Sequence, residues 1–127
     1  RRSFKINKGG DYKMIDYNKQ LVSILSPILP VHYEMTLHSG LKTPCISYIE
    51  VNNYTVADDN YQGYSRLTFQ VKVWAKNIAE IQKYSLKVDE ALRPHGFRRI
   101  SSGELYDNNS SMIQKIMTYE VLSLEVY

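Results

Sequence analysis

Residues 64–97 read YSRLTFQVKVWAKNIAEIQKYSLKVDEALRPHGF and contain the two clearest secondary-structure patterns of the chain. Apolar and polar residues alternate over residues 64–75, which is typical of a strand with one buried face. Asn77 then stands as a helix N-cap with Glu80 at the capping-box position, and apolar residues recur every three or four positions until Gly96 closes the helix. Because almost no linker separates strand and helix, the helix must fold back onto the sheet.

The chain has 127 residues, which is a common size for a single domain. Hydrophobic residues make up 43% of it and charged residues 23%, so the chain as a whole is not expected to be disordered. Residues 1–13 show neither a helical nor a strand period and contain a Gly-Gly pair. We therefore expect an N-terminal arm over residues 1–13 and a single domain over residues 14–127.

A helix and two strands are predicted after the arm. Asp16 is a plausible N-cap for a helix whose apolar residues recur three and four positions apart, and Pro27 ends it. Alternating apolar residues predict a strand over residues 31–37, followed by a turn at Ser39-Gly40. A segment rich in Ile, Tyr and Val predicts a second strand over residues 44–51.

Polar, turn-rich segments separate the remaining strands. Residues 52–63 predict a loop that is long for a compact domain, and it is therefore a candidate interaction segment. Residues 97–100 predict a short strand, residues 101–111 a turn-rich connection and residues 113–127 a final strand. The apolar positions of that final strand change face after Val121, which predicts either a β-bulge there or burial of both faces.

Together these elements predict an α+β fold. Neighbouring strands with short connections favour an antiparallel sheet of about four to five strands, with both helices packed on one side in a two-layer arrangement. No internal repeat is visible in the sequence.

The sequence contains no recognisable catalytic, metal or nucleotide motif. His32, His38 and His95 are isolated from one another, so no local metal-ligand spacing is present. Cys45 has no neighbouring histidine and no second cysteine for a disulfide, which favours synthesis inside a cell. We therefore expect no enzyme activity, no metal and no cofactor.

The net charge of +3 is spread along the chain. Basic runs are limited to the arm and to Arg98-Arg99, whereas nucleic-acid binders usually gather basic residues on one face. The acidic pair Asp89-Glu90 is expected on the solvated face of the second helix, where it would serve solubility. No apolar run approaches the ~20 residues that span a bilayer, so no membrane partner is expected.

Tyrosine is unusually frequent, with eleven Tyr against three Phe and one Trp. Its apolar face and polar tip suit surfaces that become buried on assembly, and the alternative is that the tyrosines line the edge of the core. Trp74 falls on the polar face of its strand, where a helix, a loop or another subunit must cover it. The candidate interface residues are Tyr54, Tyr61, Tyr64, Trp74, Arg98 and Arg99.

Four short motifs accompany the predicted helices and strands. They are D-x-x-x-x-L-x-x-I-L from Asp16 to Leu25, P-V-x-Y from Pro30 to Tyr33, P-x-I-x-Y from Pro44 to Tyr48 and V-x-V-W-A-K from Val71 to Lys76. With these motifs and this order of elements, residues 14–126 resemble the tail completion and tail-to-head joining (tail terminator) proteins of long-tailed bacteriophages.

The resemblance implies a structural virion protein at the neck of the particle. Such subunits form a ring, usually hexameric, that ends the tail tube and joins it to the head-tail connector or stopper protein. The implied partners are further copies of the chain, the tail tube protein, the connector, and DNA that passes non-specifically through a central channel. Assembly would take place in the host bacterial cytoplasm. The alternatives are another small protein-binding connector module and, less favoured, a nucleic-acid binder that uses Arg98, Arg99 and the arm.

Overall fold

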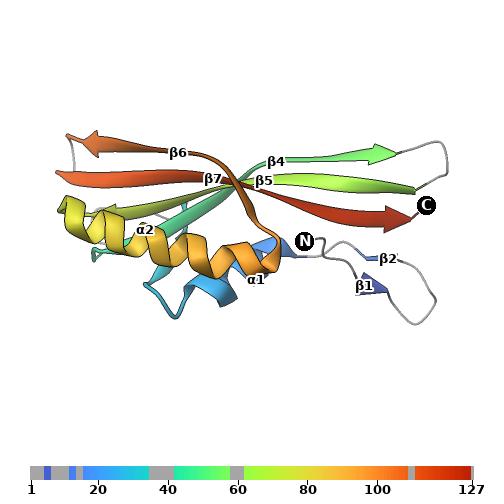
Figure 1. The fold of residues 1–127 in the computed structure, drawn as a ribbon, viewed down its shortest axis with the longest axis horizontal. Coiled ribbons are helices and arrows are strands. Elements are labelled where there is room, and N and C mark those ends of the chain that lie inside the picture. Colours follow the sequence, from blue (N-terminus) through green and yellow to red (C-terminus); the bar gives the residue numbers. More distant parts are fainter. Residues whose placement is uncertain are drawn as a thin grey trace.

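The structure, a computed structural model, has two helices on one face of a five-stranded sheet (Figure 1). It describes residues 5–6, 12–13, 16–34, 42–57, 62–108 and 111–126, with side chains over 16–34, 42–52, 65–108 and 111–123. The elements in chain order are β1 (Lys5–Ile6), β2 (Tyr12–Lys13), α1 (Tyr17–Leu25), β3 (Val31–Tyr33), β4 (Cys45–Ala57), β5 (Gln62–Ala75), α2 (Ile78–Leu92), the 3₁₀ helix η2 (Arg93–His95), β6 (Arg98–Asp107) and β7 (Met112–Val126). The predicted α+β class is confirmed.

Strand β5 lies at the centre of the sheet, whose strand order is β3-β4-β5-β7-β6. It pairs antiparallel with β4 on one side and with β7 on the other. The predicted alternation is confirmed from Leu67 onward, where every second residue of β5 is buried beneath the helices: Leu67, Phe69, Val71, Val73 and Ala75. Burying one face of this strand therefore builds the centre of the core.

Helix α2 begins where the sequence predicts. The Asn77 side-chain oxygen accepts a hydrogen bond from the backbone N–H of Glu80 at 2.9 Å, and Asn77 Nδ2 donates to the Glu80 carboxylate at 3.0 Å. The helix passes into η2, and the chain turns at Gly96, whose φ of 86° lies in the left-handed region that favours glycine.

Phe97 joins the two layers just after this turn. Its ring meets Tyr17 of α1 edge-on at a centroid distance of 6.0 Å, and it meets Phe69 of β5 at 6.2 Å. All three rings are fully buried. Helix α1 is thereby held against the sheet at the point where the chain leaves η2 for β6, and Asp16 caps its first turn by accepting from the Lys19 backbone N–H at 3.2 Å.

The expectation of an antiparallel sheet is wrong at one edge. Strand β3 pairs with β4 in parallel, with Val31 opposite Ile46 and Tyr33 opposite Tyr48, so the sheet is mixed. A hairpin turn at Ser39-Gly40 would have produced an antiparallel pair. A parallel pair needs a connection long enough to return the chain to the same end of the sheet, and residues 34–44 provide that length. The predicted strand ends earlier than expected, and residues 35–37 and the turn lie outside the described residues.

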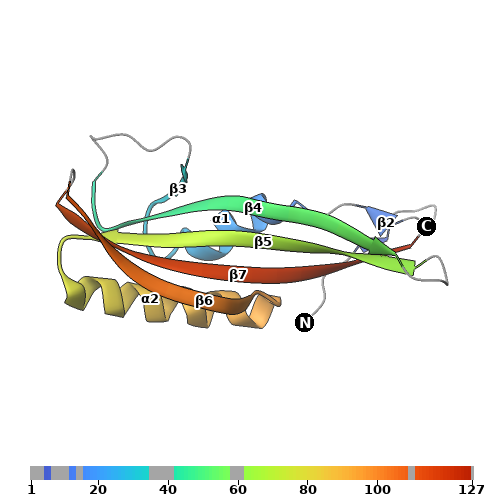
Figure 2. The ribbon, with the colours of Figure 1, turned by 90° about the horizontal axis from the view of Figure 1, so that it is seen from above.

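The prediction of a loop over residues 52–63 is wrong for residues 52–57 and 62–63, which are strand, whereas residues 58–61 lie outside the described residues. Strand β4 continues to Ala57 and pairs with the beginning of β5, after a register shift between Glu50 and Asn52. This part of the hairpin extends beyond α2, as Figure 2 shows. Because α2 does not cover this part of the hairpin, its strands need no apolar face there, and their sequence can be polar.

The predicted connection over residues 101–111 is largely strand. Strand β6 runs to Asp107 and pairs with β7, with a register shift between Arg99 and Ser101. Its side chains are exposed at nine of ten positions, so no apolar alternation marked it in the sequence. The pairing of β7 with β5 is continuous, which excludes the predicted bulge near Val121.

Two short strands occur within the predicted arm. Lys5 pairs with Lys13 and Ile6 with Tyr12, in an antiparallel sheet separate from the main one. The other residues of the arm lie outside the described part of the chain.

We expect the Phe97→Ala variant to lower the free energy of unfolding by about 3 to 5 kcal/mol, because it leaves a cavity between α1 and β5. Tyr106→Ala is the matched control, since Tyr106 is exposed on β6 and its loss should change stability by less than about 1 kcal/mol. Urea unfolding followed by circular dichroism measures both. Equal effects of the two substitutions would contradict the role given to Phe97.

Candidate interaction surfaces

The face of the sheet opposite the helices is called the open face below. Both helices lie on the other side of the sheet (Figure 1), so neither helix covers the open face. Within the described residues, the side chains of this face contact one another. Lys72 of β5 pairs with Glu34 at 2.8 Å. Glu120 of β7 lies between two arginines, Arg66 at 3.4 Å and Arg98 at 2.8 Å. Charged groups of three neighbouring strands are thus paired across this face.

Trp74 lies on the open face, where the sequence placed it. Its indole Nε1 donates a hydrogen bond to the Ser47 hydroxyl at 2.9 Å, and Ser47 is fully buried. The indole is half-buried, and its polar N–H group has a partner within the subunit, the Ser47 hydroxyl. Cys45, which pairs with Trp74 across the strands, is buried, and burial raises the pKa of its thiol.

The register places Tyr54 and Tyr64 at diagonally neighbouring positions of β4 and β5, but it separates both from Trp74. Tyr54 pairs with Arg66 and Tyr64 pairs with Val56, in the part of the β4–β5 hairpin that extends beyond α2. Trp74 is ten positions further along β5 than Tyr64, about 33 Å away at the usual rise of a strand. Tyr61 lies outside the described residues.

The sequence predicted only the beginning of an exposed edge strand, over residues 97–100. β6 lies at one edge of the sheet, and it carries three exposed apolar side chains: Ile100 at 47%, Leu105 at 56% and Tyr106 at 59% exposure. A Cβ added to Gly103, in the middle of β6, would meet no atom within 4 Å, so packing within the subunit does not require glycine there. Glycine inside a strand is typical of places where another backbone approaches closely. The only signal in the sequence was the pair of apolar residues Leu105-Tyr106 within a polar segment.

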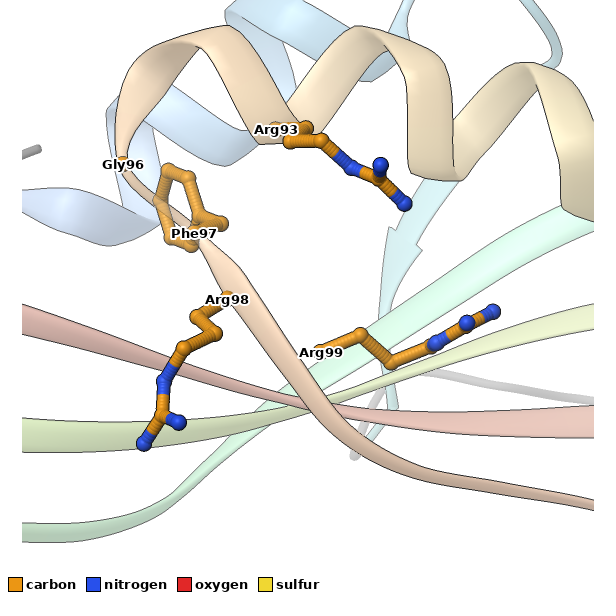
Figure 3. Close-up of a pocket in the computed structure, with 5 residues that line it drawn as sticks. All are labelled: Arg93, Gly96, Phe97, Arg98 and Arg99. Atoms are coloured by element: carbon orange, nitrogen blue, oxygen red, sulfur yellow. The ribbon is translucent and has the colours of Figure 1, made fainter.

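Arg98 and Arg99 are adjacent in sequence but lie on opposite faces of the sheet. Arg98 lies opposite Glu120 and pairs with it on the open face, whereas Arg99 lies opposite Tyr119 on the helix side. Figure 3 shows the two side chains pointing apart, with Arg99 on the same side as Arg93 from η2. The five residues Arg93, Gly96, Phe97, Arg98 and Arg99 line a pocket of about 310 Å³.

A buried carboxylate lies beside this pocket. Asp89 of α2 is only 8% exposed, which corrects the expectation that it is a solvated residue. Its Oδ1 accepts a hydrogen bond from the Tyr119 hydroxyl at 2.8 Å, and its Oδ2 accepts from Arg93 at 2.6 Å. The spacing of Asp89 from Arg93, one helical turn, was the signal available in the sequence.

The pKa values of this pair follow from the contacts. Burial alone would raise the pKa of Asp89, but the hydrogen bonds from Tyr119 and Arg93, together with the positive charge of Arg99, lower it below its usual value. Burial and the bond to Asp89 raise the pKa of the Tyr119 hydroxyl. Asp89 is therefore ionised and Tyr119 protonated at neutral pH.

Within the described residues, no group of three or more His, Cys, Asp or Glu side chains could hold a metal ion. None of the described helices has the length and apolar character needed to cross a membrane. No family model matches the sequence, and no curated protein matches it.

We expect Asp89→Asn to destabilise the protein by about 1 to 3 kcal/mol at pH 7, because the charged partner of Arg93 and Tyr119 is lost. Since the folded pKa of Asp89 is lowered, its stabilisation is present above the unfolded pKa of about 4 and is lost as pH falls through the folded value. The difference between the native protein and the variant should therefore shrink below pH 4.

Urea unfolding at a series of pH values measures this difference. Glu90→Gln is the matched control, because Glu90 neighbours Asp89 but is exposed, and the control should follow the native protein at each pH. A difference between Asp89→Asn and the native protein that is independent of pH would contradict the charge-based explanation.

Proposed function

We propose that the chain is a non-enzymatic structural subunit of a long-tailed phage particle. In this proposal it forms a hexameric ring at the head-proximal end of the tail, ends the tail tube and joins it to the head connector. The ring leaves a central channel for DNA, which it contacts without sequence specificity.

The observation that carries the ring is the presence of two unlike open edges on one sheet. At one edge β6 presents ten residues, and at the other no described strand pairs with β4 beyond Tyr48. A cyclic ring joins subunits head to tail and so needs two different contact surfaces on each subunit. Exposed sheet edges supply such surfaces through backbone hydrogen bonds to a neighbouring strand.

The assignment to a phage tail rests on the resemblance of motifs and element order. The helix that precedes the sheet, the central strand followed directly by a helix, and the terminal hairpin agree with the order expected for tail completion proteins. The tail tube protein and the connector are the proposed partners, and the neck of the virion is the proposed location.

The alternative is that the chain is another small protein-binding connector module. Such a module would use the same sheet edges, so only the identity of its partner distinguishes it from a tail completion protein. Nucleic-acid binding as the main function is less well supported, because Arg98 and Arg99 lie on opposite faces and Arg98 is paired with Glu120. A duplex-binding surface usually presents its basic residues on one face.

Native mass spectrometry of the purified chain, alone and with isolated tail tubes, tests the proposal. We expect a species of six times the subunit mass of 14.8 kDa, and electron microscopy should show it at one end of the tubes. A strict monomer that joins no tube end would overturn the ring. A ring that binds another virion protein and never a tube would favour the connector module.

We expect Leu105→Lys to weaken ring formation about tenfold or more, because an apolar contact worth about 1.5 to 3 kcal/mol is replaced by a charge at the β6 edge. Leu86→Lys is the matched control, since Leu86 is 64% exposed on α2, away from the edge. Both variants should unfold at nearly the same urea concentration as the native protein. Sedimentation velocity measures association, and equal loss in the two variants would contradict the use of β6.

A further inference from the structure

We propose that the pocket between Arg93 and Arg99 binds a carboxylate group of an acidic peptide. The pocket lies where η2 turns into β6, and the side chains of Arg93 and Arg99 extend from it on the helix side of the sheet (Figure 3). This inference is independent of the ring, because it concerns a site within one subunit.

The fold brings the two guanidinium groups to the same pocket from different elements. Arg93 belongs to η2 at the end of α2, and Arg99 belongs to the first residues of β6. The left-handed turn at Gly96 reverses the chain between them, and the buried ring of Phe97 anchors that turn. Figure 3 shows both arginine side chains extending to the same side of the strand, whereas Arg98 extends to the other.

Arg93 and Arg99 have hydrogen-bonding capacity that the described residues do not use. Asp89 already accepts from Tyr119 on one oxygen and from Arg93 on the other. Within the described residues Arg99 forms no ion pair shorter than 4.0 Å, and the side chain of Arg93 is 72% exposed despite its bond to Asp89. A guanidinium carries five N–H donors in a planar fork, and two parallel N–H groups match the two oxygens of a carboxylate.

The size and charge of the site favour a peptide over a nucleic acid. A pocket of about 310 Å³ admits a side chain or a chain end, and Phe97 and Gly96 give it a partly apolar wall. Asp89 offsets the charge of Arg93, and Glu120 offsets that of Arg98. Among the residues that line the pocket, Arg99 keeps the one positive charge without an ion-pair partner in the described residues, which suits a single carboxylate better than a polyanion. Specific duplex binders typically neutralise about six to ten phosphates, whereas this site offers two arginines.

The test uses the full chain and an acetylated, amidated hexapeptide that contains two glutamates, titrated by amide NMR at low ionic strength. We expect shifts at the backbone amides around Gly96 and Arg99, and at least tenfold weaker binding by Arg99→Gln. Lys83→Gln is the matched control, since it removes a positive charge from an exposed residue of α2 that does not line the pocket, and it should change affinity by less than about twofold. The same peptide with glutamines in place of glutamates should not bind.

Three results would overturn the proposal. They are equal binding of the glutamine peptide, equal weakening by Lys83→Gln and Arg99→Gln, and tighter binding of a short DNA duplex that is lost in Arg99→Gln. Arg99→Lys keeps the charge without the fork, so binding intermediate between the native protein and Arg99→Gln would support carboxylate recognition. Because Arg99 is exposed, these variants are expected to fold, and circular dichroism spectra check that they do.

Discussion

The pairing of β5 with β4 on one side and with β7 on the other organises the five-stranded sheet. One face of β5 is apolar and the other carries Arg66 and Lys72, so a slip of one residue would bury charges and expose Phe69. The register of β5 therefore sets the register of β7. Strand β7 in turn places β6, and with it the residues that line the arginine pocket.

Elements with one buried face and local capping residues could be predicted from the sequence. The alternation in β5, the cap at Asn77 and the glycine at 96 all follow from local chemistry, and the structure confirms each. Strand β6 could not be predicted in full, because an exposed edge strand needs no apolar pattern. The parallel direction of β3 depends on the path of the chain, which local residue preferences do not encode.

The arginine pocket was only partly visible in the sequence. Arg98 and Arg99 stood out as a basic pair, but the two-residue period of a strand sends them to opposite faces. Arg99 instead lies on the same side as Arg93, six positions earlier, because the turn at Gly96 reverses the chain. Such a pairing of residues across a turn requires the geometry of the whole helix-to-strand corner. The two arginines next to each other in sequence therefore extend to opposite faces of the sheet.

The central position of β5 and β7 also has a kinetic consequence. The β4–β5 and β6–β7 pairs are hairpins between strands adjacent in the chain, whereas α2 and β6 separate β5 from β7. The pairing of Gln62 with Val126 closes a loop of more than half the 127-residue chain. Local contacts form faster than distant ones, since closing a longer loop costs more entropy. The two hairpins should form early, and the pairing of β5 with β7 that joins them should form late. The middle of the finished sheet is then the last part of it to assemble.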